Sequence, residues 1–133
     1  MSAELELQKG LLLVLGATIP NAFGVPAPVF DDVAQDTPAP YVTVPDATLS
    51  DYSGDGFTGF NVLVTIHTWS DYRGSAEVKG LQGKIYDLLN RAELVVTGFN
   101  VLGCDSINGN VLRDPNGVTR HGVQQFRVLM TKV

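Results

Sequence analysis

The chain has 133 residues, of which 44% are hydrophobic, and this is enough for one domain with one hydrophobic core. Charged residues make up 17%, below the roughly 25% of typical globular proteins, which favours a protein that hides surface in an assembly. The net charge of −5 argues against a protein that grips nucleic acid, because phosphate binding needs a basic surface. We therefore expect a single domain over residues 1–133.

The N-terminal segment has the pattern of an amphipathic helix from Ala3 to Leu15. Ser2 is the expected N-cap, acidic residues occupy the first turn, and Gly10 falls on the polar side. The apolar run at residues 11–15 follows glutamates instead of basic residues, so we expect a soluble, intracellular protein and not a secretion signal. The apolar face is predicted to consist of Leu7, Leu11, Leu12, Val14 and Leu15.

Several strands are expected in the middle of the chain. The prolines of residues 16–40 predict an extended connection with a short strand at 29–30, followed by a strand at 41–44 and a polar loop at 46–59. The strand predicted at 60–69 has a core side with Val64 and Ile66. Its second side carries Leu63, His67 and Trp69, and we expect a loop or another subunit to cover it.

A polar hinge at residues 70–74 leads to a second predicted helix at 75–89, with Ser75 as N-cap. Gly80 and Gly83 fall on or near its outer side, where each costs about 1 kcal/mol relative to alanine. Either this cost is simply tolerated, or the glycines let another chain approach the helix backbone. The apolar stripe is predicted to contain Val78, Leu81, Ile85, Leu88, Leu89 and Ala92.

Strands follow to the end of the chain, at residues 93–97, 99–104, 107–112 and 118–131. Asp114-Pro115-Asn116-Gly117 predicts a turn before the last strand. A change of parity near Gln124-Gln125 predicts either a β-bulge in that strand or a strand with both faces used. The fold class expected is α+β, with two helices packed on a mainly antiparallel sheet in the order α-β-β-α-β-β-β.

The residues give no signal of catalysis. Cys104 is the only cysteine, and a small α+β enzyme that uses it with a histidine is the alternative to an inert buried thiol. The chain has neither the spacing of metal ligands nor a phosphate-binding or dinucleotide-binding loop, so we expect no metal and no cofactor.

Two polar clusters are the candidate interaction sites. The first, at the hinge, has Trp69, Asp71, Tyr72 and Arg73, and the second, around the last turn, has Arg113, Asp114, Arg120 and His121. Aromatic residues with arginine commonly anchor protein interfaces. The alternative for each cluster is a solvated turn with an Arg–Asp pair, worth about 0–1 kcal/mol.

In their order and spacing, short motifs along most of the chain resemble the tail-completion, or tail-terminator, family of tailed bacteriophages and prophages. Residues 51–60 and 103–110 depart from the family pattern. The motifs include Ser2-Ala3-Glu4-Leu5, Val29-Phe30-Asp31-Asp32-Val33, Pro40-Tyr41-Val42, His67-Thr68-Trp69-Ser70-Asp71-Tyr72-Arg73-Gly74, Arg113-Asp114-Pro115-Asn116-Gly117 and His121-Gly122-Val123.

The resemblance implies a structural virion protein without enzymatic activity. Such a protein forms a homo-oligomeric ring, usually a hexamer, that caps the tail tube, ends tail elongation and offers the head–tail joining surface. Its expected partners are further copies of itself, the tail tube protein and the head–tail connector protein, with DNA only passing through the lumen and no membrane involved. The expected location is the head-proximal end of the virion tail, after assembly in the host cytoplasm. The alternative is a neighbouring head–tail connector of the adaptor or stopper type.

Overall fold

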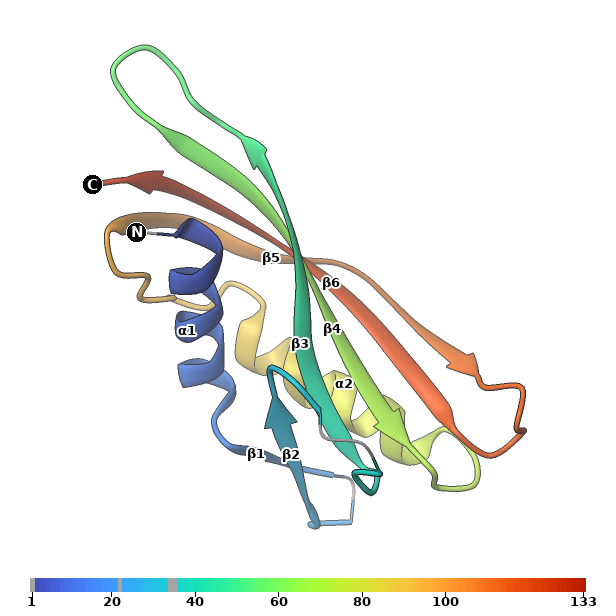
Figure 1. Ribbon diagram of the computed structural model, residues 1–133. Helices are drawn as coiled ribbons and strands as arrows, with labels where there is room; N and C mark the ends of the chain where they lie inside the picture. The colour runs from blue at the N-terminus through green and yellow to red at the C-terminus, as the bar shows by residue number, and fades with distance from the viewer. Residues whose placement is uncertain (1, 22, 34–35) are drawn as a thin grey trace.

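The computed structural model describes residues 2–21, 23–33 and 36–133. Helices α1 (Ala3–Leu15) and α2 (Ala76–Leu89) pack on a six-stranded sheet of order β1-β2-β3-β4-β6-β5 (Figure 1). The strands are β1 (Thr18–Pro20), β2 (Pro26–Phe30), β3 (Tyr41–Asp51), β4 (Gly59–Ser70), β5 (Phe99–Arg113) and β6 (Arg120–Lys132). The α+β class is confirmed, and so is the predicted alternation of helix, strands, helix and strands.

The sheet is mainly antiparallel, as predicted. Among the pairs in the described residues, β2 runs parallel to β3 and all the others are antiparallel. The longest uninterrupted pairing joins β4 to β6, from Gly59↔Thr131 to Ser70↔Arg120. This long register decides which distant residues meet at each end of the sheet.

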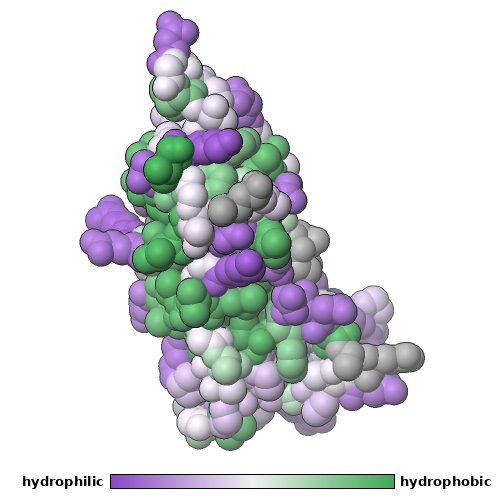
Figure 2. All heavy atoms as spheres, turned by 60° about the vertical axis from the view of Figure 1, so that its left-hand side comes forward, coloured by the Kyte–Doolittle hydropathy of each residue, from purple (hydrophilic) through white to green (hydrophobic). Residues whose placement is uncertain are grey.

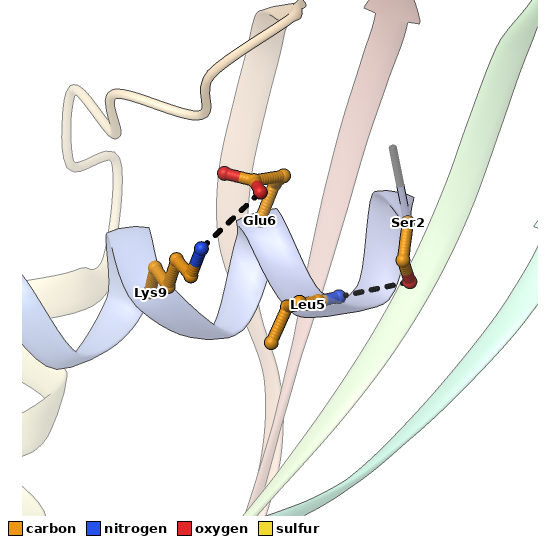
Figure 3. A network of polar contacts seen from close by, with 4 residues as sticks. All are labelled: Ser2, Leu5, Glu6 and Lys9. Carbon is orange, nitrogen blue, oxygen red and sulfur yellow. Dashed lines mark hydrogen bonds and ion pairs between the residues drawn. The ribbon is translucent and has the colours of Figure 1, made fainter.

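Helix α1 has the predicted bounds and cap. The Ser2 hydroxyl accepts a hydrogen bond from the Leu5 backbone N–H at 3.3 Å, and Lys9 Nζ lies 3.4 Å from Glu6 Oε1 (Figure 3). Figure 2 brings the α1 side of the molecule forward and shows apolar side chains exposed between hydrophilic ones. Leu13 is 79% exposed on the solvent side of α1.

The prediction that Gly10 lies on the solvent side of α1 is wrong. Gly10 is buried, and a Cβ at this position would lie 2.7 Å from the Val95 backbone oxygen. The helix therefore needs glycine there because the chain segment after α2 crosses against its backbone. Leu7, Leu11 and Leu15 are buried as predicted, and Leu12 and Val14 are partly buried against the core.

Helix α2 begins one residue later than predicted, and Ser75 makes no side-chain capping bond. The φ and ψ angles of Ser75, −108° and 3°, lie outside the extended region that an N-cap residue usually occupies. Leu88 is 39% exposed and not part of the buried stripe, and Ala92 lies beyond the end of the helix. The buried stripe consists of Val78, Leu81, Ile85 and Leu89.

The strands are divided differently from the prediction. The connection at 16–40 contains β1 and β2, and β3 continues to Asp51, so the first part of the loop predicted at 46–59 is strand. Residues 93–97 form only an isolated bridge, Val96↔Phe99, and the two strands predicted at 99–112 are one strand, β5. Where β5 pairs with β6, the register shifts lie in β5, between Val101/Gly103 and Ser106/Asn108, and not in the last strand near Gln124. A further shift lies in β3, between Thr43 and Asp46.

Both helices cover one face of the sheet and leave the other bare. Val62, Val64 and Ile66 of β4 are buried on the helix side and belong to the same core cluster as the α1 leucines and the α2 stripe. The second side of β4, with Leu63, His67 and Trp69, is half-buried. Within the described residues, neither helix is long and apolar enough to cross a membrane.

The outer border of the sheet at β5 is partly covered by the end of α2. The Cys104 carbonyl accepts a hydrogen bond from the Arg91 backbone N–H at 2.6 Å, and the Ser106 backbone N–H donates to Asn90 Oδ1 at 3.0 Å. These groups of β5 are therefore already bonded, although β5 has no strand beyond it.

Candidate interaction surface

The two polar clusters predicted separately lie side by side at one end of the sheet. The register of β4 and β6 pairs Trp69 with His121 and Ser70 with Arg120. Just beyond, the Thr119 hydroxyl donates to Asp71 Oδ1 at 2.9 Å. We call this region the hinge–hairpin end, defined as residues 69–73 and 113–121.

A stack of rings lies on the bare face at the hinge–hairpin end. The Trp69 and His121 rings are 3.8 Å apart between centroids and 9° from parallel, and the Tyr41 ring stacks on Trp69 at 6.3 Å. His67 Nδ1 lies 2.6 Å from His121 Nε2, so one of these nitrogens donates a hydrogen bond to the other. All four side chains are half-buried, and a partner that covers them removes aromatic surface from water.

The surroundings of the stack shift the pKa values of two of its rings, His121 and Tyr41. Burial lowers the pKa of His121, and the neighbouring His67 lowers it further, while the carboxylate of Asp114 acts in the opposite direction. Burial also raises the pKa of Tyr41, with a smaller contribution from the Asp71 carboxylate. The stack is therefore an environment that disfavours added charge.

Exposed apolar side chains border the stack. Tyr72 is 45% exposed and contacts Phe23, itself 54% exposed, at 4.8 Å between ring centroids. Leu112, opposite His121 on β5, and Val118, in the hairpin turn, are also exposed. Large exposed apolar residues that gather at one place mark interaction sites more often than isolated ones do.

The charged residues of the two clusters are not paired with each other. Arg120 donates to the backbone carbonyls of Gly117 and Val118 at 3.4 and 3.0 Å, and the only ion pair in the described part of the chain is Lys9–Glu6. Arg73 and Arg113 are exposed. The alternative of an Arg–Asp pair in either turn is therefore not found.

A buried hydrogen-bond network fixes the hinge to α2. The Glu77 carboxylate, in the first turn of α2, accepts from the Ser70 hydroxyl at 2.5 Å and from Asn21 Nδ2 at 2.7 Å. Asn21 Oδ1 in turn accepts from the backbone N–H groups of Phe23 and Val25, both at 2.9 Å. The hinge, the β1–β2 turn and α2 thus form one connected unit beneath the exposed aromatic residues.

The two glycines of α2 differ in their surroundings. Gly83 is exposed and a Cβ there would meet nothing within 4 Å, whereas Gly80 is half-buried. The open surroundings of Gly83 fit both predicted alternatives, a tolerated cost and the approach of another chain to the helix.

Sequence reasoning did not select Tyr41, His67 or Phe23 as site residues. His67 and Trp69 lie two residues apart in a strand, so their side chains share one face. This spacing could have identified His67 as a neighbour of Trp69 on the bare face. Tyr41 and Phe23 reach the site through β3 and the β1–β2 turn, and only the three-dimensional register brings them there.

The arrangement does not support thiol chemistry. Cys104 is fully buried, and burial together with the nearby Asp105 raises its pKa to about 11, so the thiol stays protonated near neutral pH. Cys104 pairs with Val128 on the helix side of the sheet, whereas both histidines lie on the bare side. No group of three or more possible metal ligands occurs within the described residues.

Comparisons with known proteins agree with these features. The family described as tail completion protein gp17 matches residues 14–131. The tail completion protein gp17 of Bacillus phage SPP1 is 25% identical over 99 residues, which cover 74% of this chain and 73% of the phage protein. A chain in the virion of the native gene transfer agent (GTA) particle has the same fold, with a TM-score of 0.73 and 20% identity over 98% of this chain and 92% of that chain. Because the family match spans most of the chain, this protein is a structural component of the virion tail, not an enzyme, and belongs to the tail completion protein gp17 family.

Proposed function

We propose that copies of this protein form a ring, a hexamer, that caps the tail tube, ends tail elongation and provides the surface to which the head is joined. The observation that carries this proposal is the family match over residues 14–131. The bare sheet face and the exposed aromatic residues at the hinge–hairpin end support it, because both are surfaces that a neighbouring subunit would cover.

The hinge–hairpin end is the proposed contact with a neighbouring subunit or with the tail tube protein. It offers half-buried rings at its centre and exposed arginines around them, the composition of a protein interface. The outer side of α2 at Gly80 and Gly83 is a second proposed contact. The contact residues proposed at the hinge–hairpin end are Trp69, Asp71, Tyr72, Arg73, Arg113, Asp114, Arg120 and His121.

DNA is proposed to pass through the lumen of the ring without specific binding. The net charge of −5 suits this role, because a weakly acidic lumen does not hold the phosphate backbone.

Deletion of the gene, followed by negative-stain microscopy of the particles, tests the position of the protein. A terminator predicts tails of excessive length, because tube growth is no longer stopped. Tailless heads would instead identify a head–tail connector of the adaptor or stopper type. Tails of normal length joined to heads would contradict both roles.

Complementation of the deletion tests the residue assignment. Arg73→Ala and Arg113→Ala are expected to reduce the yield of joined tails of correct length. Lys132→Ala is the control, because Lys132 is exposed and lies at the opposite end of β6 from the hinge–hairpin end. Normal yields with both arginine variants would show that these residues are not contacts.

A further inference from the structure

The two parts of α2 are held to the sheet by different kinds of contact. Residues 81–89 contribute Leu81, Ile85 and Leu89 to the main hydrophobic cluster. Val78, in the first part at residues 76–80, is fully buried but lies outside that cluster. Apolar burial therefore holds the rest of α2 more firmly than its first part. The side chains buried around the first part are mostly polar, namely Thr68, Ser70 and Gln124 on the sheet and Glu77 on the helix.

Two of these polar side chains are incompletely bonded. Gly122 lies directly below the helix, since a Cβ there would be 2.9 Å from Val78 Cγ2 and 2.6 Å from Gln82 Nε2. Thr68 pairs with Gly122 and is fully buried, and its hydroxyl has no hydrogen-bond partner in the described part of the chain. The same holds there for Gln124 Oε1. Because a buried polar atom without a partner costs free energy, water that enters under the first part of α2 offsets some of the cost of lifting it.

The first part of α2 is held down by the Glu77 network, defined as Asn21, Ser70 and Glu77. The Ser70 hydroxyl donates to Glu77 Oε1 at 2.5 Å, and Asn21 Nδ2 donates to Glu77 Oε2 at 2.7 Å. Ser75 makes no side-chain capping bond that would secure the start of the helix. Two hydrogen bonds to side chains outside the helix are therefore the main polar restraint on its first turn.

The same network is bonded to two exposed aromatic residues at the hinge–hairpin end. The Ser70 hydroxyl accepts from the Tyr72 backbone N–H at 3.1 Å, and Asn21 Oδ1 accepts from the Phe23 backbone N–H at 2.9 Å. The Tyr72 and Phe23 rings contact each other at 4.8 Å between centroids. Each of these residues is thus one hydrogen bond away from a side chain that bonds Glu77. A contact that fixes the two rings also restrains the network.

We propose that the Glu77 network couples the hinge–hairpin end to the first part of α2. In the free chain, residues 76–80 open and close as a local unit while residues 81–89 stay packed. A partner that covers Tyr72 and Phe23 holds the network closed and so orders the helix around Gly80, at the second proposed contact. Because coupling between two binding sites is reciprocal, each contact strengthens the other. The inference rests on the two contacts proposed above and adds that they form cooperatively.

Hydrogen exchange of single backbone amides, followed by NMR on chains that light scattering shows to be single, measures the opening. The N–H groups of residues 79–82 bond to the carbonyls of residues 75–78, as Lys79 does to Ser75 at 3.0 Å, so they report on the first part of α2. The N–H groups of residues 86–89 report on the rest. We expect the first set to exchange about tenfold faster or more than the second. Equal exchange of the two sets would overturn the inference.

Two substitutions under the helix should change the exchange in opposite directions. Ser70→Ala removes a donor to Glu77 and should speed exchange at residues 79–82 by about tenfold or more, with little change at 86–89. Thr68→Val removes the hydroxyl that lacks a partner among the described residues and nearly keeps the shape, so it should slow the same exchange by about threefold or more. Circular dichroism checks that each variant is folded. An equal change in both sets of amides would show that α2 opens only as a whole, which contradicts a local unit.

Tyr72→Ala tests the coupling to the surface. It removes the ring that contacts Phe23 and should speed exchange at residues 79–82 by about threefold or more. Leu112→Ala is the matched control, because it removes an exposed apolar side chain beside His121 on the bare face, and it should leave this exchange unchanged. In the Ser70→Ala background Tyr72→Ala should add little, since the link is already cut. Equal effects in both backgrounds, or no effect in either, would refute the coupling.

The coupling and the proposed ring can fail separately. Exchange is measured on the free chain, so its outcome does not depend on whether copies form a ring. If deletion of the gene leaves tails normal, the ring is wrong whatever the exchange shows. If the exchange is uniform along α2, the coupling is wrong although the ring stands.

Discussion

The network around Glu77 should be one of the most sensitive points of the fold. Glu77 is only 6% exposed, and its two carboxylate oxygens each accept a hydrogen bond, from Ser70 and from Asn21. Glu77→Ala removes both acceptors and leaves two polar side chains buried without them. We expect this variant to lower the free energy of unfolding substantially and to loosen the hinge.

The magnitude follows from the two lost bonds. A hydrogen bond to a charged group contributes about 1.5–3 kcal/mol, so the loss should be about 3–5 kcal/mol. For a domain of this size this corresponds to a fall in Tm on the order of 10–20 °C. Glu77→Gln should cost only about 1–2 kcal/mol, because its amide oxygen can still accept from Asn21 while the Ser70 hydroxyl accepts from its NH2 group.

Asn21 cannot compensate by turning its amide around. Its Oδ1 accepts from the backbone N–H groups of Phe23 and Val25, which would then lose their acceptor. Urea unfolding followed by circular dichroism measures the effect, with Asp87→Ala on the exposed side of α2 as the control. A loss of less than about 1 kcal/mol for Glu77→Ala, or a loss as large for Glu77→Gln, would refute this reasoning.

Three further predictions concern other parts of the fold. Gly10→Ala should destabilise the protein by about 1–3 kcal/mol, because the new Cβ would press against the Val95 carbonyl. Gly83→Ala should stabilise the folded chain by about 0.5–1 kcal/mol and, if another subunit approaches there, weaken assembly. Urea unfolding measures the two changes in stability, and light scattering measures assembly. Cys104, with its pKa raised to about 11, should react with iodoacetamide only after unfolding, and rapid alkylation of the native protein would contradict its burial. Because the folded pKa of His121 is below the ordinary 6.5, the unfolded chain binds its proton more readily, so stability should be complete above about pH 6.5 and fall as the pH is lowered. Urea midpoints from about pH 8 to about pH 5 measure this fall, and an unchanged slope in His121→Asn would show that this histidine is not its source.

The two helices were predictable because their signals are local. Ser2 caps α1 as expected, and the apolar spacing of α2 identifies Val78, Leu81 and Ile85 as buried. Gly10 was misplaced because its burial depends on Val95, which is 85 residues away in the chain and whose position no helical wheel contains.

The sheet was harder to predict where proline interrupts the usual strand pattern. β1 and β2 contain prolines at their ends and centre, which their place near the border of the sheet permits. β3 passes through Pro45 with a register shift between Thr43 and Asp46, so its continuation did not resemble a strand.

The candidate site was predictable in composition but not in arrangement. Aromatic residues and arginines near turns indicated Trp69, Arg73 and Arg113. That Trp69 stacks on His121 follows from the twelve-residue register of β4 and β6, which no local pattern specifies.

The covered border of β5 has a consequence for the life of the free subunit. A long open strand acts as a template for fibrous aggregates. Because Asn90 and Arg91 bond to the middle of β5, that strand is a poorer template for fibres while a chain is not yet part of a tail.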